Sequence, residues 1–166
     1  MFRNMRRFKQ ELSQEETIRI FEQNSYGVLA LSGNDGYPYA VPLGYHFANG
    51  CLYFHGAKQG HKMDAIRTES KASFCVVEQD KVVPKEFTTY FISAIAFGKI
   101  TIVEDESKKR SILEDISEKY APGDVEGREY EINKAWKNVC VFQLEIEHMS
   151  GKAALQIVRD NKNKGQ

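Results

Sequence analysis

A run of short strand-like segments, each ended by a turn signal, sets the strongest limit on the fold of this chain. Residues 26–32 are followed by a Gly-Asn-Asp-Gly turn at 33–36, residues 37–47 by an Ala-Asn-Gly turn at 48–50, and residues 51–55 by another glycine. Turns of this composition join antiparallel strands into hairpins. Short strands at such spacing build barrels and sandwiches, so the sequence predicts an antiparallel, β-rich domain.

Helical periodicity flanks these strands. Ser13 and Glu16 form an S-x-x-E capping box that predicts a helix start at Ser13 and an end near 24–27. Further helices are expected at 60–69, 104–120 and 125–137, and further strands at 71–77, 87–104 and 139–146, with a turn at 79–81. The prediction is a β-rich α+β fold with one domain at 13–158, an N-terminal arm at 1–12 and a disordered tail at 159–166.

The segment 87–104 is the longest β signal, and both of its faces are apolar through the middle. A small barrel has only one interior, so the second face needs another partner. That partner is a ligand, a helix or a second subunit.

Composition argues against several classes of function. The chain carries 23 basic and 23 acidic side chains, so no overall field favours nucleic acid. No run approaches the roughly 20 apolar residues of a membrane span, and no apolar stretch follows the basic N-terminus as in a signal peptide. Three cysteines, an odd number lying far apart, favour buried reduced thiols in a cytoplasmic protein. No zinc motif occurs, so no metal site is expected.

The segment 37–46 carries large side chains on one face and small or cyclic ones on the other. Pro42 cannot donate to a strand ladder and implies an edge or a bulge, and Gly44 allows close approach to the backbone. An exposed backbone of this kind suits a flat ring rimmed with hydrogen-bonding groups, such as a flavin. The alternative is that the small residues accommodate a helix packed across the strand.

The segment that follows Phe54 has the features of a phosphate site. Gly56 and Gly60 give the loop flexibility, while Lys58, His61 and Lys62 supply charge near the start of the helix at 60–69. This is no Walker A loop, because the glycines are one residue too close, so ATP or GTP hydrolysis is disfavoured. A solvated basic turn is the alternative.

Other polar residues give weaker signals. Ser93 lies within an apolar strand, where its hydroxyl needs either a ligand or a backbone carbonyl as a partner. No motif of a nucleophilic serine surrounds it. The four histidines form no metal-binding motif, and a haem ligand among them is kept as an alternative. No catalytic residue is identified.

Several motifs together resemble one family. Val41-Pro42-Leu43-Gly44-Tyr45 and the segment 52–62 are similar to those of the pyridoxamine-5′-phosphate-oxidase-like flavoproteins. Within that superfamily, the sequence resembles the group of 5-nitroimidazole antibiotic resistance proteins (nitroimidazole reductases). The likeness continues through 93–99, 119–122 and 150–152, and so covers about residues 5–155.

The resemblance implies a split β-barrel of the FMN-binding type that forms a homodimer, with FMN in the grooves between the subunits. It implies that the backbone of Pro42, Leu43 and Gly44 lines the flavin ring. The full set of cofactor-binding residues expected on this basis is Val41, Pro42, Leu43, Gly44, His55, Gly56, His61, Lys62, Ser93 and Trp136. Trp136 or a nearby aromatic residue is expected to close the site from the partner subunit.

The resemblance also implies an activity. Residues 153–158 lack the Trp and Arg groups with which true pyridoxamine phosphate oxidases hold flavin and substrate, so that oxidation is not expected. His61 stands where many relatives carry arginine. The expected function is an FMN-dependent reductase of small nitroaromatic compounds, with protons from solvent, Tyr45 or His55. The alternatives are a flavin- or haem-binding module without rapid turnover, and a structural dimer without cofactor.

Overall fold

Within residues 2–164, the part of the chain that the computed structural model describes (the side chains of Asp35 and residues 160–164 excepted), one antiparallel sheet of seven strands forms the centre of the molecule. Its strand order is β2-β1-β5-β6-β7-β4-β3. The strands are β1 (Tyr26–Ser32), β2 (Pro38–Gly44), β3 (His46–Ala48), β4 (Cys51–Ala57), β5 (Lys71–Val83), β6 (Thr88–Ile102) and β7 (Val139–Ala153). The helices are η1 (Phe8–Gln10), α1 (Gln14–Gln23), η2 (Asn34–Gly36), α2 (His61–Thr68), η3 (Pro84–Glu86), α3 (Glu106–Tyr120), α4 (Val125–Ala135) and α5 (Leu155–Lys164).

The sheet curls into a split barrel, as expected. Its two edge strands, β2 and β3, follow each other in the chain with only Tyr45 between them, so the chain passes directly from one edge of the sheet to the other. The sequence predicted one strand over 37–47, and this was wrong at Tyr45. That side chain is fully buried, and its hydroxyl donates to the carbonyl oxygen of Phe21 at 2.9 Å. Because Tyr45 is fixed in the core, the strand leaves β1 before it and joins β4 after it.

Aromatic side chains fill the barrel. Phe54 stacks on Phe142 with ring centroids 5.2 Å apart and meets Phe74 edge-on at 5.1 Å. All three rings are fully buried, and burial of each contributes roughly 1.5–3 kcal/mol to folding. These rings lie on β4, β5 and β7, so the core ties together strands that are far apart in sequence.

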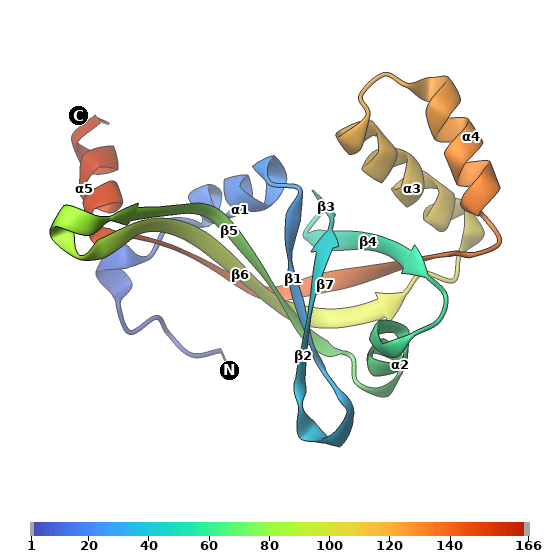
Figure 1. Cartoon of the computed structure of the whole chain (residues 1–166), viewed down its shortest axis with the longest axis horizontal. Coiled ribbons are helices and arrows are strands. Elements are labelled where there is room, and N and C mark those ends of the chain that lie inside the picture. The colour runs from blue at the N-terminus through green and yellow to red at the C-terminus, as the bar shows by residue number, and fades with distance from the viewer. Residues whose placement is uncertain (1, 165–166) are drawn as a thin grey trace.

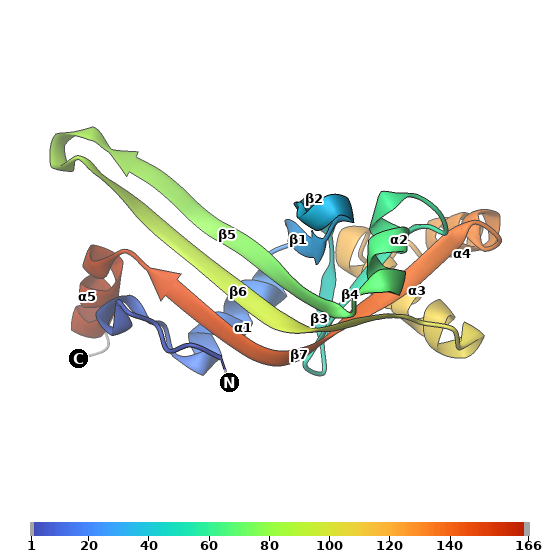
Figure 2. The same cartoon turned by 90° about the horizontal axis from the view of Figure 1, so that it is seen from below.

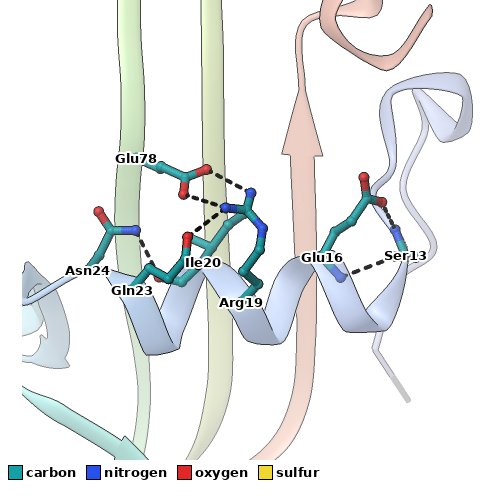
Figure 3. Close-up of polar contacts among 7 residues, drawn as sticks. All are labelled: Ser13, Glu16, Arg19, Ile20, Gln23, Asn24 and Glu78. Atoms are coloured by element: carbon teal, nitrogen blue, oxygen red, sulfur yellow. Dashed lines mark hydrogen bonds and ion pairs between the residues drawn. The ribbon is translucent and has the colours of Figure 1, made fainter. Parts of the chain in front are cut away.

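Helix α1 lies across the barrel and begins with the expected capping box. Ser13 N–H donates to the Glu16 carboxylate at 2.8 Å, and Glu16 N–H donates to Ser13 Oγ at 3.1 Å (Figure 3). Farther along the helix, Arg19 pairs with Glu78 of β5 at 3.3 Å, which links α1 to the sheet. The opposite face of the helix buries Ile20 and Phe21 in the barrel.

A second layer covers the outside of β4 and β7. Helices α3 and α4 form an antiparallel pair at one end of the molecule, and α2 lies at the same end on the other side of β4 (Figure 1). A separate apolar cluster joins the pair to the sheet: Val103, Ile112, Leu113, Ile116, Ile132, Val139 and Val141.

Strands β5 and β6 extend beyond the barrel as a long two-stranded arm (Figure 2). The turn predicted at 79–81 is wrong, because β5 continues to Val83, with a bulge between Val77 and Gln79. Residues in this arm face solvent, so polar side chains are tolerated within the strand and do not mark its end. The last strand likewise exceeds the predicted 139–146 and ends at Ala153.

The two faces of β6 differ in burial. Ala94, Ala96 and Ile100 are buried in the barrel, whereas Ile95 and Phe97 on the other face are each 37% exposed. Within one chain the outer face of β6 is therefore only partly covered, and its coverage by a ligand or a second subunit stays a prediction.

The N-terminal arm and α5 both lie near β7. Leu12 N–H donates to Gly151 O at 3.0 Å, which ties the N-terminal arm to the sheet. The sequence predicted a disordered tail from residue 159, whereas α5 remains helical to Lys164; residues 165 and 166 lie outside the described part. No helix among the described residues has the length and apolar character that crossing a membrane requires.

Candidate functional site

The start of α2 is open to an external acceptor. Strand β4 ends at Ala57, and the chain then turns through Gly60, whose φ of +110° favours glycine. No side chain caps α2, so N–H groups of its first turn lack the partner that a capping residue supplies. Arg67 on the same helix donates to the carbonyl oxygen of Lys58 at 3.0 Å and so braces the loop.

Lys62 places its ammonium group beside this opening. A Cβ added to Gly56 would lie 2.8 Å from Lys62 Nζ, so glycine is needed for the ammonium to lie against β4. The group also lies 5.1 Å from the centroid of the Phe142 ring. Burial lowers the pKa of Lys62, and no carboxylate among the described residues forms an ion pair with it. Buried charges in proteins are usually paired, so an anion would stabilise this half-buried cation.

Two histidines flank Lys62. Burial, and secondarily the Lys62 ammonium, lowers the pKa of His55, so its imidazole is neutral at pH 7. The ring of His61 stacks on that of Tyr39, with centroids 4.1 Å apart and planes 20° from parallel. This contact brings the edge strand β2 against the start of α2. The segment 37–46 and the loop that follows Phe54, both predicted from the sequence as ligand-binding, therefore lie side by side.

Strand β2 shows the expected division into two faces. Pro38, Ala40 and Pro42 are exposed, while Val41 and Leu43 pack against the barrel core. Pro42 lies on an edge strand, as predicted. A ligand on this face would therefore meet the backbone of residues 41–43 and the ring of Pro42.

Gly44 has a different explanation. A Cβ at Gly44 would lie 2.5 Å from the hydroxyl of Tyr120, which α3 inserts there. That hydroxyl donates to Ser25 O at 2.6 Å and accepts from Tyr45 N–H at 3.1 Å. Of the two explanations for the small face of β2, a packed helix therefore accounts for Gly44, while Pro42 remains open to a ligand.

The remaining two candidates lie elsewhere. Ser93 is half-buried on β6 between Val77 and Lys152, and the register places it on the same sheet face as Pro42. Trp136 follows α4, and its ring covers the ammonium of Lys109 at 4.1 Å. Within one chain, then, Gly56, His55, His61 and Lys62 come together, β2 adjoins them, and Trp136 belongs to the α3–α4 layer.

Sequence reasoning missed several neighbours of this site: Tyr39, Arg67, Phe142, Cys140 and Lys109. Gly56 is paired with Cys140 across β4 and β7, a contact between residues far apart in sequence that no local pattern reveals. Lys58, Arg67 and Lys109 also line a pocket of ≈300 Å³ beside the loop, together with Glu104 and Glu106, and burial raises the pKa of the Cys140 thiol there.

Comparison with solved structures supports the fold. A candidate 5-nitroimidazole antibiotic resistance protein from Bacteroides thetaiotaomicron matches with a TM-score of 0.73 and 22% identity, over 86% of this chain and 85% of that one. An FAD- and haem-binding protein from Mycobacterium smegmatis matches with a TM-score of 0.73 and 24% identity, over 88% and 73% of the two chains. A flavocytochrome from Azotobacter vinelandii matches with a TM-score of 0.76 and 20% identity, over 91% and 72%.

Comparison with curated proteins finds no significant match. The family model described as pyridoxamine 5′-phosphate oxidase matches residues 13–153, which include the whole barrel and the loop at the start of α2. The chain therefore belongs to the pyridoxamine 5′-phosphate oxidase family.

Proposed function

We propose that this protein binds FMN and uses it to reduce small nitroaromatic compounds of the 5-nitroimidazole kind. The observation that carries the proposal is the unpaired, half-buried ammonium of Lys62 beside the uncapped start of α2. Helix N-termini with an added cation bind phosphate groups, and FMN ends in a phosphate. Membership of the family and its flavin-binding structural relatives support the same cofactor class.

The proposal assigns each part of FMN to a part of this site. The phosphate is held by Lys62 and His61, and Gly56 and His55 lie along the chain that joins the phosphate to the ring. The ring is placed against the backbone of Val41, Pro42 and Leu43. On this proposal the contact of Tyr39 with His61 sets the spacing between the phosphate end and the ring end.

Ser93 and Trp136 complete the site in a homodimer. The outer face of the sheet exposes apolar side chains of β1, β5 and β6: Val28, Val77, Ile95 and Phe97. A second copy that covers this face removes apolar surface from water and brings its own residues next to Ser93. The proposed contribution of Trp136 from the partner belongs to this dimer.

The bound flavin supplies the electron transfer, and the chain positions and shields it. Two side chains were expected as proton sources. Burial raises the pKa of Tyr45, and its hydroxyl already donates to Phe21 O, so it is a poor acid for substrate. His55 is neutral at pH 7 and lies next to Lys62, so the proton comes from solvent or through His55.

Replacement of Lys62 tests the phosphate site. Lys62→Ala removes the only half-buried ammonium at this loop, and we expect flavin affinity to fall at least tenfold, because a charge-assisted contact to phosphate contributes roughly 1.5–3 kcal/mol. Lys62→Arg keeps the charge and should restore part of the affinity. Lys81→Ala, an exposed lysine in the β5–β6 arm, is the control and should bind FMN like the unaltered protein. Equal affinity of all four proteins would overturn the proposed site.

A binding module without rapid turnover is the second candidate. Two structural relatives carry haem in addition to flavin, which favours this possibility over other classes. The two functions differ in the rate at which flavin-loaded protein, supplied with reduced nicotinamide, consumes a 5-nitroimidazole. Steady turnover supports the reductase, while full flavin occupancy with no turnover supports the module.

A further inference from the structure

A second pocket lies at the opposite end of the molecule from α2. It has a volume of ≈580 Å³ and lies between the N-terminal arm, the beginning of β6 and α5. Figures 1 and 2 both show α5 next to the N-terminal arm and far from α2. The pocket is therefore separate, within one chain, from the proposed flavin site.

Cationic side chains from two elements line this pocket. Arg6, Arg7 and Lys9 come from the N-terminal arm, and Arg159 comes from α5. None of the four forms an ion pair with a carboxylate in the described part of the chain. The one carboxylate among the lining residues, Glu86, accepts a hydrogen bond from a tyrosine hydroxyl at 2.8 Å. In a protein whose formal net charge is zero, this local excess of positive charge attracts an anion.

The wall contributed by β6 is aromatic. Tyr90 and Phe91 both line the pocket, and the ammonium of Lys152 lies 5.4 Å from the centroid of the Phe91 ring. Aromatic rings beside cations suit a ligand that is both flat and negatively charged.

We propose that this pocket binds a small planar aromatic carboxylate. The carboxylate pairs with Arg6 and Arg7, and the ring lies against Tyr90 or Phe91. The two parts of the ligand follow from two features of the lining: cations without a carboxylate partner, and aromatic rings.

Calorimetric titration with 4-hydroxybenzoate at low ionic strength tests the proposal. The double variant Arg6→Gln/Arg7→Gln should bind the probe about tenfold more weakly, because it removes both cations with which the carboxylate pairs. Arg3→Gln is the matched control, because Arg3 lies in the same arm but does not line the pocket, and its affinity should be unchanged. The neutral analogue 4-hydroxybenzamide should bind the unaltered protein at least tenfold more weakly than the acid.

Three results would overturn the assignment: no binding of the acid by the unaltered protein, equal affinity for acid and amide, or equal affinity of the double variant. A rise in affinity on dilution of the protein would show that a second copy fills the pocket, and would also count against a small-molecule site. Flavin content should be the same in all variants, so the outcome is independent of the proposed reductase function. The substituted arginines are exposed, and thermal unfolding at an unchanged temperature verifies that the variants fold.

Discussion

Position 44 is a glycine either because Tyr120 packs against it or because a ligand does. A double-mutant cycle that measures the energetic coupling between Gly44 and Tyr120 distinguishes the two explanations. Gly44 lies outside the positive-φ region, so alanine fits its backbone, and the penalty of Gly44→Ala comes from contact alone. The new Cβ would lie 2.5 Å from the Tyr120 hydroxyl and must displace it.

The expected loss of unfolding free energy follows from the hydrogen bonds that Tyr120 makes. Displacing the hydroxyl removes its bond to Ser25 O and its bond from Tyr45 N–H, although the latter N–H keeps a second acceptor in Ser25 O at 3.1 Å. At about 1 kcal/mol for each net hydrogen bond, plus local repacking, Gly44→Ala should cost about 2 kcal/mol in unfolding free energy. Tyr120→Phe, which removes only the hydroxyl, should cost about 1 kcal/mol.

The double variant separates the two explanations. If Tyr120 accounts for the glycine, the two losses share one interaction, and the double variant should lose about 2 rather than 3 kcal/mol. A coupling of about 1 kcal/mol exceeds the 0.3–0.5 kcal/mol within which independent sites add. Urea unfolding of flavin-free protein provides the values. It is done at one fixed concentration, because the stability of the proposed dimer would depend on concentration. Strict additivity of the two free-energy losses would refute the reasoning. It would favour contact with a ligand as the reason for a glycine at position 44.

Three further predictions rest on separate contacts. Ser13→Ala removes the capping box of α1 and should lower the unfolding free energy by about 1 kcal/mol in the same urea assay, with the neighbouring exposed Gln14→Ala as a control that changes it little. Gly56→Ala should leave the urea midpoint nearly unchanged, because the Cβ meets the flexible end of Lys62, but should weaken FMN binding in a fluorescence titration; unaltered binding would remove Lys62 from the site. The pKa values of His46 and His55 are lowered mainly by burial, so below the ordinary value of about 6.5 the unfolded chain binds more protons than the native one. Stability should therefore fall as the pH drops below about 6.5, and His55→Asn should reduce this fall; a flat profile from pH 7.5 to 5 would contradict it.

Local patterns predicted much of the fold for identifiable reasons. The capping box at Ser13 and the Gly-Asn-Asp-Gly turn at 33–36 act within a few residues, and both structures form where expected. The errors arose where tertiary contacts override local signals. Tyr45 breaks a continuous strand because its ring is anchored in the core, and the polar residues 79–81 stay in a strand because the arm is exposed on both faces.

The candidate site was predicted in its chemistry but not in its contacts. Lys62 and His61 follow from the loop sequence, whereas the ring of Tyr39 on His61 and that of Phe142 near Lys62 depend on how β2 and β7 are placed in the barrel. The role of Tyr120 at Gly44 depends in the same way on the docking of α3, since the two residues are far apart in the chain. The spacing of residues along the chain gives no information about contacts between residues so far apart.

The visible absorption spectrum of the protein as isolated, followed by heat release and mass identification of any chromophore, tests the central claim most directly. The account predicts a flavin band and the release of FMN. A haem band would indicate that the protein binds haem. Release of FAD would show that the cofactor is FAD and not FMN, and the proposed flavin site would be kept. A colourless protein that also fails to bind added FMN would contradict the claim that Lys62 and the start of α2 form a flavin phosphate site.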